Sequence, residues 1–131
     1  MSEPLPLPIC ALVEEWLAWC VWTADPGNKE STDSPVGHFE FAWTVEHHPA
    51  RAWEAIMKVT EDPRAKTFLG LLAAGPLEDL LALHGDEYID QVEAAAYENP
   101  TFARMLLGVA KFTMSDAIWE RVQRIQRQLA Q

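Results

Sequence analysis

Four prolines constrain most strongly what this chain of 131 residues can fold into, because an apolar run at helical spacing follows each of them. The prolines are Pro49, Pro63, Pro76 and Pro100. The residues that precede them are His48, Asp62, Gly75 and Asn99. Proline is favoured at the first position of a helix, where its missing N–H has no intrahelical partner to lose, and Asp, Asn and Gly are favoured caps. Each of the four prolines therefore predicts the start of a helix.

The apolar periodicity between these starts predicts eight helices. Their ranges are 9–24, 37–48, 49–60, 63–74, 76–84, 86–98, 100–112 and 115–130. Asp86 and Ser115 are the expected caps of two of them, and Gly75 and Gly85 are expected to end helices in the left-handed conformation. Only the stretch 39–45 also allows a strand, because it holds aromatic and β-branched residues.

Joints of one or two residues between short helices require neighbouring helices to fold back on each other. We therefore predict a single all-α domain over residues 1–131, a compact stack of about seven to eight short antiparallel helices in HEAT-like helical pairs. Within it we expect a Trp-rich N-terminal helix in residues 1–26, a polar loop at 27–37 and the helical stack in 38–131.

The periodicity also predicts which side chains form the core. The expected core residues are Trp16, Trp53, Phe68, Leu72, Leu80, Ile89, Val92, Phe102, Leu106 and Ile118. Trp16, Trp19 and Trp22 recur in steps of three, so the stripe drifts around its helix and one face cannot bury all three equally. We expect Trp22 to be partly exposed beside the 27–37 loop, where an aromatic side chain is typical of a protein interface.

The first residues have no basic region ahead of an apolar run with a small-residue cleavage site, which argues against a secretory signal. The apolar run at 9–22 is too short to span a bilayer and contains two Glu. We therefore predict a cytoplasmic protein in which Cys10 and Cys20 are reduced, buried thiols.

Charge excludes one class of partner and suggests another. The net charge is −10 and the sequence pI is near 4.7, so direct binding to nucleic-acid phosphates is not expected. Seven acids and no Lys or Arg occur between residues 67 and 103, whereas residues 101–131 have five bases and two acids. An acidic block of this kind either keeps a protein soluble or steers a basic partner toward it.

Four of these acids form what we call the acidic stripe, since they fall on or beside one face of the predicted helix 86–98. They are Asp86, Glu87, Asp90 and Glu93, and Tyr97 continues the stripe. We expect Asp90 and Glu93 to project to solvent, so that reversing both to Lys slows association with a basic partner and leaves the fold unchanged.

A metal site is the competing interpretation of the same region. Its candidate ligands are Glu78, His84 and Asp90, with the other carboxylates of residues 78–93 around them. His47 and His48 point about 100° apart on a helix, so a shared metal requires the helix to end there. The sequence contains no phosphate-binding glycine loop, no H-E-x-x-H, no C-x-x-C and no nucleophile elbow, and we expect no cofactor.

Residues 73–93 contain the runs A-G-P-L-E-D-L-L and L-H-G, and N-P-T-F and L-L-G-V follow at 99–109. Together these runs resemble a bacterial family of small proteins classed only as a domain of unknown function. The resemblance extends from about Ala52 to Ile125 and leaves the N-terminal helix and the 27–37 loop outside. It implies an all-helical cytoplasmic protein and brings no activity, cofactor or catalytic residue with it.

The function predicted from these features is a non-enzymatic module that binds a basic protein, as immunity proteins, antitoxins and charge-mimicking inhibitors do. Its expected contact residues are the acidic stripe, Tyr97 and Trp22. A metal-dependent enzyme that uses the 78–93 carboxylates and His84, and a structural subunit of a homo-oligomer, remain as alternatives.

Overall fold

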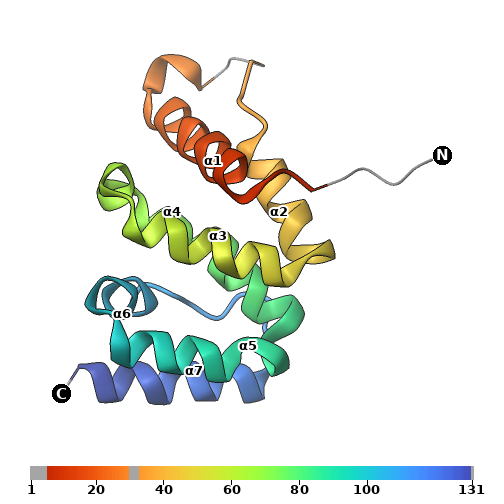
Figure 1. Ribbon diagram of the computed structural model, residues 1–131. Helices are drawn as coiled ribbons and strands as arrows, with labels where there is room; N and C mark the ends of the chain where they lie inside the picture. Colours follow the sequence, from red (N-terminus) through yellow and green to blue (C-terminus); the bar gives the residue numbers. More distant parts are fainter. Residues whose placement is uncertain (1–5, 30–32, 131) are drawn as a thin grey trace. The chain divides into compact units, whose positions relative to one another are not determined.

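The computed structural model describes residues 6–29 and 33–130, and every regular element among them is helical (Figure 1). The all-α prediction is therefore confirmed for these residues, including 39–45, which lie in a helix and not in a strand. The chain divides into two compact units, residues 1–66 and 67–131. Residues 30–32 of the predicted loop lie outside the described part.

The first unit is built from three α-helices, α1 (Ile9–Ala24), α2 (Gly37–His47) and α3 (Pro49–Glu61). A 3₁₀ turn, η1 (Pro26–Asn28), follows α1, and the carboxylate of Asp25 accepts a hydrogen bond from the Gly27 N–H at 2.8 Å. That Asx turn ends α1 where the sequence predicts. After α3, the Asp62 carboxylate accepts from the Arg64 N–H at 2.9 Å and begins the 3₁₀ helix η2 (Pro63–Phe68).

The core of the first unit lies where α1 packs against both α2 and α3. Trp16 on α1 is fully buried, and its ring meets Phe41 of α2 edge-on at a centroid distance of 6.0 Å. Gly37, the first residue of α2, lies against the backbone of α1. Small and apolar residues complete this core, namely Leu12, Leu17, Cys20, Val45, Ala52, Ala55, Ile56 and Val59.

An Arg64 guanidinium joins α1 to the end of α3 within this unit. It donates to both carboxylate oxygens of Glu14, at 2.9 and 2.5 Å, and to Asp62 at 2.7 Å. These hydrogen bonds from Arg64 lower the pKa of Glu14 and of Asp62 below their ordinary values. Arg64 and Glu14 are exposed and Asp62 is half-buried, so the contribution of these pairs to stability is modest.

The second unit begins with a short helix, α4 (Leu69–Leu72), and a π-helical turn, η3 (Ala73–Leu77). The long helix α5 (Glu78–Glu98) follows, then α6 (Pro100–Leu106) and α7 (Asp116–Leu129). Helix α5 packs against both α6 and α7. At His84 the backbone of α5 leaves the helical region, with φ −134° and ψ 29°, and the helix continues beyond this kink.

The prediction that each of the four prolines begins a helix is wrong at one of them. Asn99 caps α6 through hydrogen bonds from the Thr101 and Phe102 N–H groups to its side-chain oxygen, and Ser115 caps α7 in the same way through Ile118. Pro76 is the exception, because it lies inside the π-helical turn and no helix begins there. Glycine has no side-chain acceptor, so Gly75 cannot satisfy the N–H groups that Asn99 satisfies.

Several predicted boundaries are corrected by the structure. The predicted break between the helices 76–84 and 86–98 is present as the kink at His84, but the chain continues directly into the second part of α5, so Asp86 lies within α5 and is not a cap. The predicted helix 100–112 ends at Leu106, and an irregular segment runs from there to Ser115. Neither Gly75 nor Gly85 is left-handed, since no described glycine has a positive φ. The eight predicted helices are therefore not matched.

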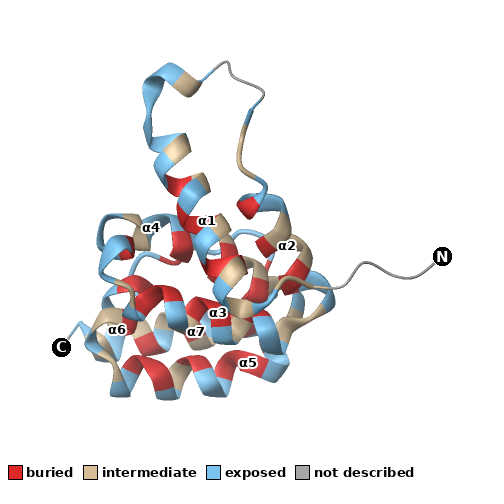
Figure 2. Cartoon of the chain, turned by 45° about the horizontal axis from the view of Figure 1, so that its top comes forward, coloured by how far each residue is buried: buried red, intermediate tan, exposed pale blue. Residues whose placement is uncertain are grey.

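Figure 2 shows buried residues interspersed with exposed ones along the helices of both units. Eight of the ten predicted core residues are buried, and Trp53 and Phe68 are only half-buried. Trp53 lies about 100° around α3 from Ala52, at the edge of the buried face. Phe68 belongs to a 3₁₀ helix, whose three-residue turn places it off the face that a 3.6-residue period predicts.

Of the two thiols, Cys20 is free and buried as predicted, and burial raises its pKa to about 12. Cys10 is also free but exposed, which corrects the prediction that both are buried. In the described part, one helical stretch, Pro63–Glu98, is long and apolar enough to cross a membrane by length and composition. Core helices of globular proteins meet the same criterion.

Candidate protein-binding surface

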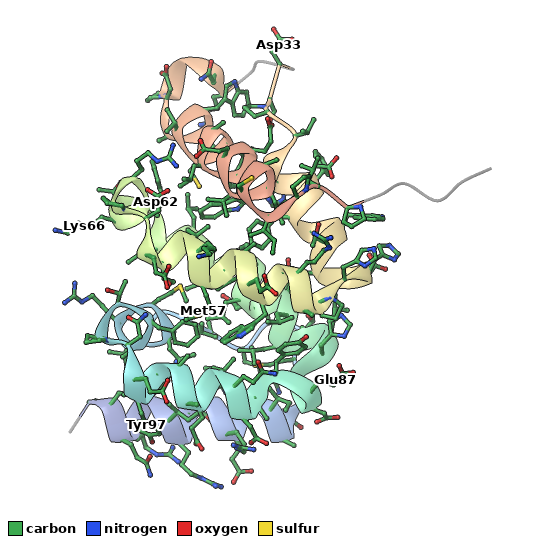
Figure 3. All side chains as sticks on the ribbon, viewed as in Figure 1. Asp33, Met57, Asp62, Lys66, Glu87 and Tyr97 are labelled. Carbon is green, nitrogen blue, oxygen red and sulfur yellow. The ribbon has the colours of Figure 1, made fainter. Side chains whose placement is uncertain are left out.

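The exposed face of α5 runs along most of the helix with steps of three and four residues. Its exposed residues are Leu83, Asp86, Glu87, Asp90, Gln91, Ala94, Tyr97 and Glu98. Figure 3 shows Glu87 toward the kinked end of α5 and Tyr97 toward the opposite end. Three of the four acids of the acidic stripe therefore lie on the surface, and Glu93 is half-buried.

Half of the stripe is already paired within the protein. Helix α7 packs beside α5, and its Arg121 guanidinium donates to Asp90 at 2.9 Å and lies 3.6 Å from Glu93. Asp90 is exposed as predicted, with 84% of its side chain accessible, whereas Glu93 is half-buried. Their charges are compensated by Arg121, so a partner gains less from them than from an unpaired acid.

Tyr97 is tied to the same neighbouring helix. Its hydroxyl donates a hydrogen bond to the side-chain oxygen of Gln128 on α7, while its ring remains more than half exposed. The hydrogen bond fixes the ring at one end of the exposed face. A tyrosine held in this way offers apolar area at a small entropic cost.

Asp86 and Glu87 are the other half of the stripe, and they differ from Asp90 and Glu93. Within residues 6–29 and 33–130, neither takes part in an ion pair. Both line a pocket of about 200 Å³ at the kink of α5, together with His84 and with Ser115 and Ile118 at the start of α7. We call this the kink pocket. Leu83, also at its wall, is 57% exposed.

The kink pocket has the chemistry to receive a cationic side chain. Two exposed carboxylates supply charge, Ser115 supplies a hydroxyl, and Leu83 and Ile118 supply apolar contact for an aliphatic stem. Lysine and arginine combine such a stem with a charged end. The sequence singled out the acids of this site and missed Leu83, whose only signal is an apolar residue three positions before Asp86.

The candidate metal ligands are placed differently. Glu78 is buried at the start of α5, and its carboxylate accepts a hydrogen bond from the Ala110 N–H. Asp90 pairs with Arg121, and His84 lies at the kink. Among the described residues, no three His, Cys, Asp or Glu side chains are grouped so that they could hold a metal ion.

Burial raises the pKa of Glu78, the bond from Ala110 opposes that shift, and the nearby Asp79 adds to it. In the folded protein Glu78 therefore holds its proton at a higher pH than in the unfolded chain, where its ordinary pKa is 4.5. Ionisation then costs stability as the pH rises through and above 4.5, because the unfolded chain binds fewer protons there.

We expect the replacement Glu78→Gln to remove this cost. The free energy of unfolding of the variant should increase relative to that of the wild type as the pH is raised from about 4 to 7. Urea unfolding of both proteins across this range measures the difference. A difference that does not change with pH, or that favours the wild type more at pH 7 than at pH 4, would contradict it.

Trp22, the remaining predicted contact residue, belongs to the first unit. It is half-buried at the end of α1 and lines a separate pocket of about 350 Å³ with Asn28 and Lys29. The Asn28 side-chain amide donates to the Trp22 carbonyl oxygen at 3.0 Å. Its place beside the start of the 27–37 loop agrees with the prediction from the sequence.

Comparison with known proteins places the chain in a family. No curated protein and no solved structure matches it. Residues 26–129 match the model of a family described as "Family of unknown function (DUF6869)". This match is longer than the resemblance seen in the sequence and includes the 27–37 loop, whereas α1 stays outside it. Since the match covers most of the chain, the protein belongs to this family of unknown function.

Proposed function

We propose that the protein is a non-enzymatic binding module that recognises a basic protein through the exposed face of α5. One observation carries the proposal: Asp86 and Glu87 are exposed, take part in no ion pair among the described residues, and line the kink pocket beside the exposed Leu83. An apolar contact next to desolvated charges is the arrangement from which protein interfaces draw their affinity.

The partner in this proposal carries a Lys or Arg that enters the kink pocket and an apolar residue that covers Leu83. The protein as a whole has a net charge of −10, which attracts such a partner at a distance of about one Debye length, about 8–10 Å at physiological salt. An immunity or antitoxin role is one form that such a module takes. We also propose that the protein is cytoplasmic and that its helices pair as in HEAT repeats.

The test is a charge reversal with a matched control. The variant Asp86→Lys/Glu87→Lys should lose a basic protein that the wild type captures from a lysate of the source organism, and the wild-type association rate should fall as salt rises. The control Glu54→Lys/Glu61→Lys reverses two exposed acids of α3 and gives the same net charge.

If binding depends only on net charge, both variants weaken capture equally. If Asp86 and Glu87 form the site, only the first variant abolishes it, and the control slows association by no more than a few-fold. Capture that survives the first variant, or that is insensitive to salt, would remove the basis of the proposal.

A further inference from the structure

A second exposed surface lies on α2, in the first unit, and carries apolar in place of acidic side chains. Its residues follow at steps of three, four and three, namely Val36, Phe39, Trp43 and Glu46, and we call them the α2 aromatic face. They lie opposite the buried side of α2, which is formed by Gly37, Phe41, Thr44 and Val45. Phe39 is 73% exposed, Val36 is about half exposed and Trp43 is half-buried.

The aromatic rings of this face are held in place by their neighbours. The Trp43 ring lies close to two imidazoles, with centroid distances of 4.9 Å to His47 and 5.4 Å to His48. Phe39 meets His38 edge-on at 5.7 Å, and His38 stacks on Trp19 of α1 at 4.6 Å and 22°. Rings that are ordered before binding lose little conformational entropy when a partner covers them.

We infer that the α2 aromatic face is a docking site for an amphipathic helix of a partner protein, with large apolar side chains on one side and Lys or Arg beside them. The spacing of three and four residues matches the apolar stripe of such a helix. Phe and Trp are the side chains that anchor protein interfaces.

Charge decides between this occupant and a second copy of the chain. Residues 37–48 contain two Glu, three His and no Lys or Arg. Glu46 stands exposed at one end of the face, and its carboxylate lies 3.9 Å from the His47 imidazole. A Lys or Arg of the docked helix adds an opposite charge beside Glu46. A second copy brings another net charge of −10 and another α2 without Lys or Arg, so its α2 offers Glu46 no such group.

The probe is a synthetic peptide of about 18 residues, or about five helical turns. Leu residues form one face of its helix and Lys residues the other. Its dissociation constant is measured by titration calorimetry against the full chain. We expect Phe39→Ala to weaken binding by about tenfold or more, as at an interface anchor. Phe112→Ala is the matched control, since Phe112 is 80% exposed and lies in the other unit.

Charge at the face is tested in the same way. Glu46→Lys should weaken binding several-fold, whereas Glu61→Lys, which reverses an exposed acid of α3, should change it by less than about twofold. A counterpart peptide with Glu in place of Lys should not bind. Thermal unfolding of each variant shows that its fold is intact, as expected for exposed positions.

Other outcomes overturn the inference. If Phe39→Ala leaves the affinity unchanged, the peptide binds elsewhere, and loss of binding in Asp86→Lys/Glu87→Lys then assigns it to the kink pocket and supports only the proposed function. Equal losses in Phe39→Ala and Phe112→Ala show nonspecific contact. A wild-type mass that doubles with concentration in sedimentation, and does not in Phe39→Ala, makes a second copy the occupant.

Discussion

Replacing Gly37 by Ala is expected to destabilise the protein by about 3 kcal/mol or more, the upper end of what overpacking costs. An ideal Cβ at this position lies 2.0 Å from the Glu15 carbonyl oxygen and 2.5 Å from the Trp16 nitrogen. Both are backbone atoms of α1, so no side-chain rotation relieves the contact. Helices α1 and α2 must separate, and the buried contact between Trp16 and Phe41 opens with them.

The opposing effect is smaller. Alanine is a better helix former than glycine by about 1 kcal/mol, and Gly37 is the first residue of α2. Gly70→Ala isolates this term, because nothing lies within 4 Å of a Cβ built at Gly70 in α4. We expect Gly70→Ala to unfold at the wild-type temperature or slightly above it.

Urea or thermal unfolding followed by circular dichroism measures both variants. If Gly37→Ala unfolds together with Gly70→Ala, the close approach of α1 and α2 does not exist. The result also bears on the family, because Gly37 lies within the matched residues 26–129 and its contact atoms on α1 lie before them.

The sequence predicted those elements whose boundaries are set by local chemistry. Helix α1 has the predicted limits, since the Asp25 carboxylate and the following proline end it without help from the rest of the fold. Asn99 and Ser115 cap their helices through side-chain oxygens that can be read directly from the sequence. Such signals act over two or three residues and need no tertiary information.

Boundaries that depend on packing could not be predicted in this way. Gly75-Pro76 resembles Asn99-Pro100 as a pattern, but the chain passes through it in a π-helical turn. Gly85 suggested a left-handed helix end, yet it lies inside α5 where an added Cβ would come within 2.8 Å of Ile118 on α7. Its small size serves close packing between two helices that are far apart in sequence.

The candidate site shows the same division. Periodicity placed Asp86, Asp90 and Glu93 near one face of a helix, and the structure agrees. What periodicity could not show is which helix lies beside that face. Arg121, 31 residues after Asp90, compensates two of the acids and leaves the unpaired charge at the kink. The kink itself lies at one non-helical residue, His84, beside Gly85, where the sequence predicted the end of a helix.

Two phenylalanines of the second unit should differ strongly in how much stability is lost when each is replaced by Ala. Phe102 in α6 is fully buried, whereas Phe112 in the irregular segment after α6 is 80% exposed. Truncation of a buried phenylalanine to Ala costs about 3–5 kcal/mol, as lost burial and as a cavity that its neighbours fill only in part. Truncation of an exposed one changes stability by about 0.5 kcal/mol or less.

A domain of this size has a total stability of about 5–15 kcal/mol, so Phe102→Ala removes a large share of it and should lower the melting temperature by many degrees. Phe112→Ala should melt with the wild type. Trp53 was expected in the core like Phe102 but is half-buried, so Trp53→Ala should fall between them. Calorimetric melting of the three variants orders them. Equal melting temperatures for Phe102→Ala and Phe112→Ala would show that the inner face of α6 is wrongly assigned.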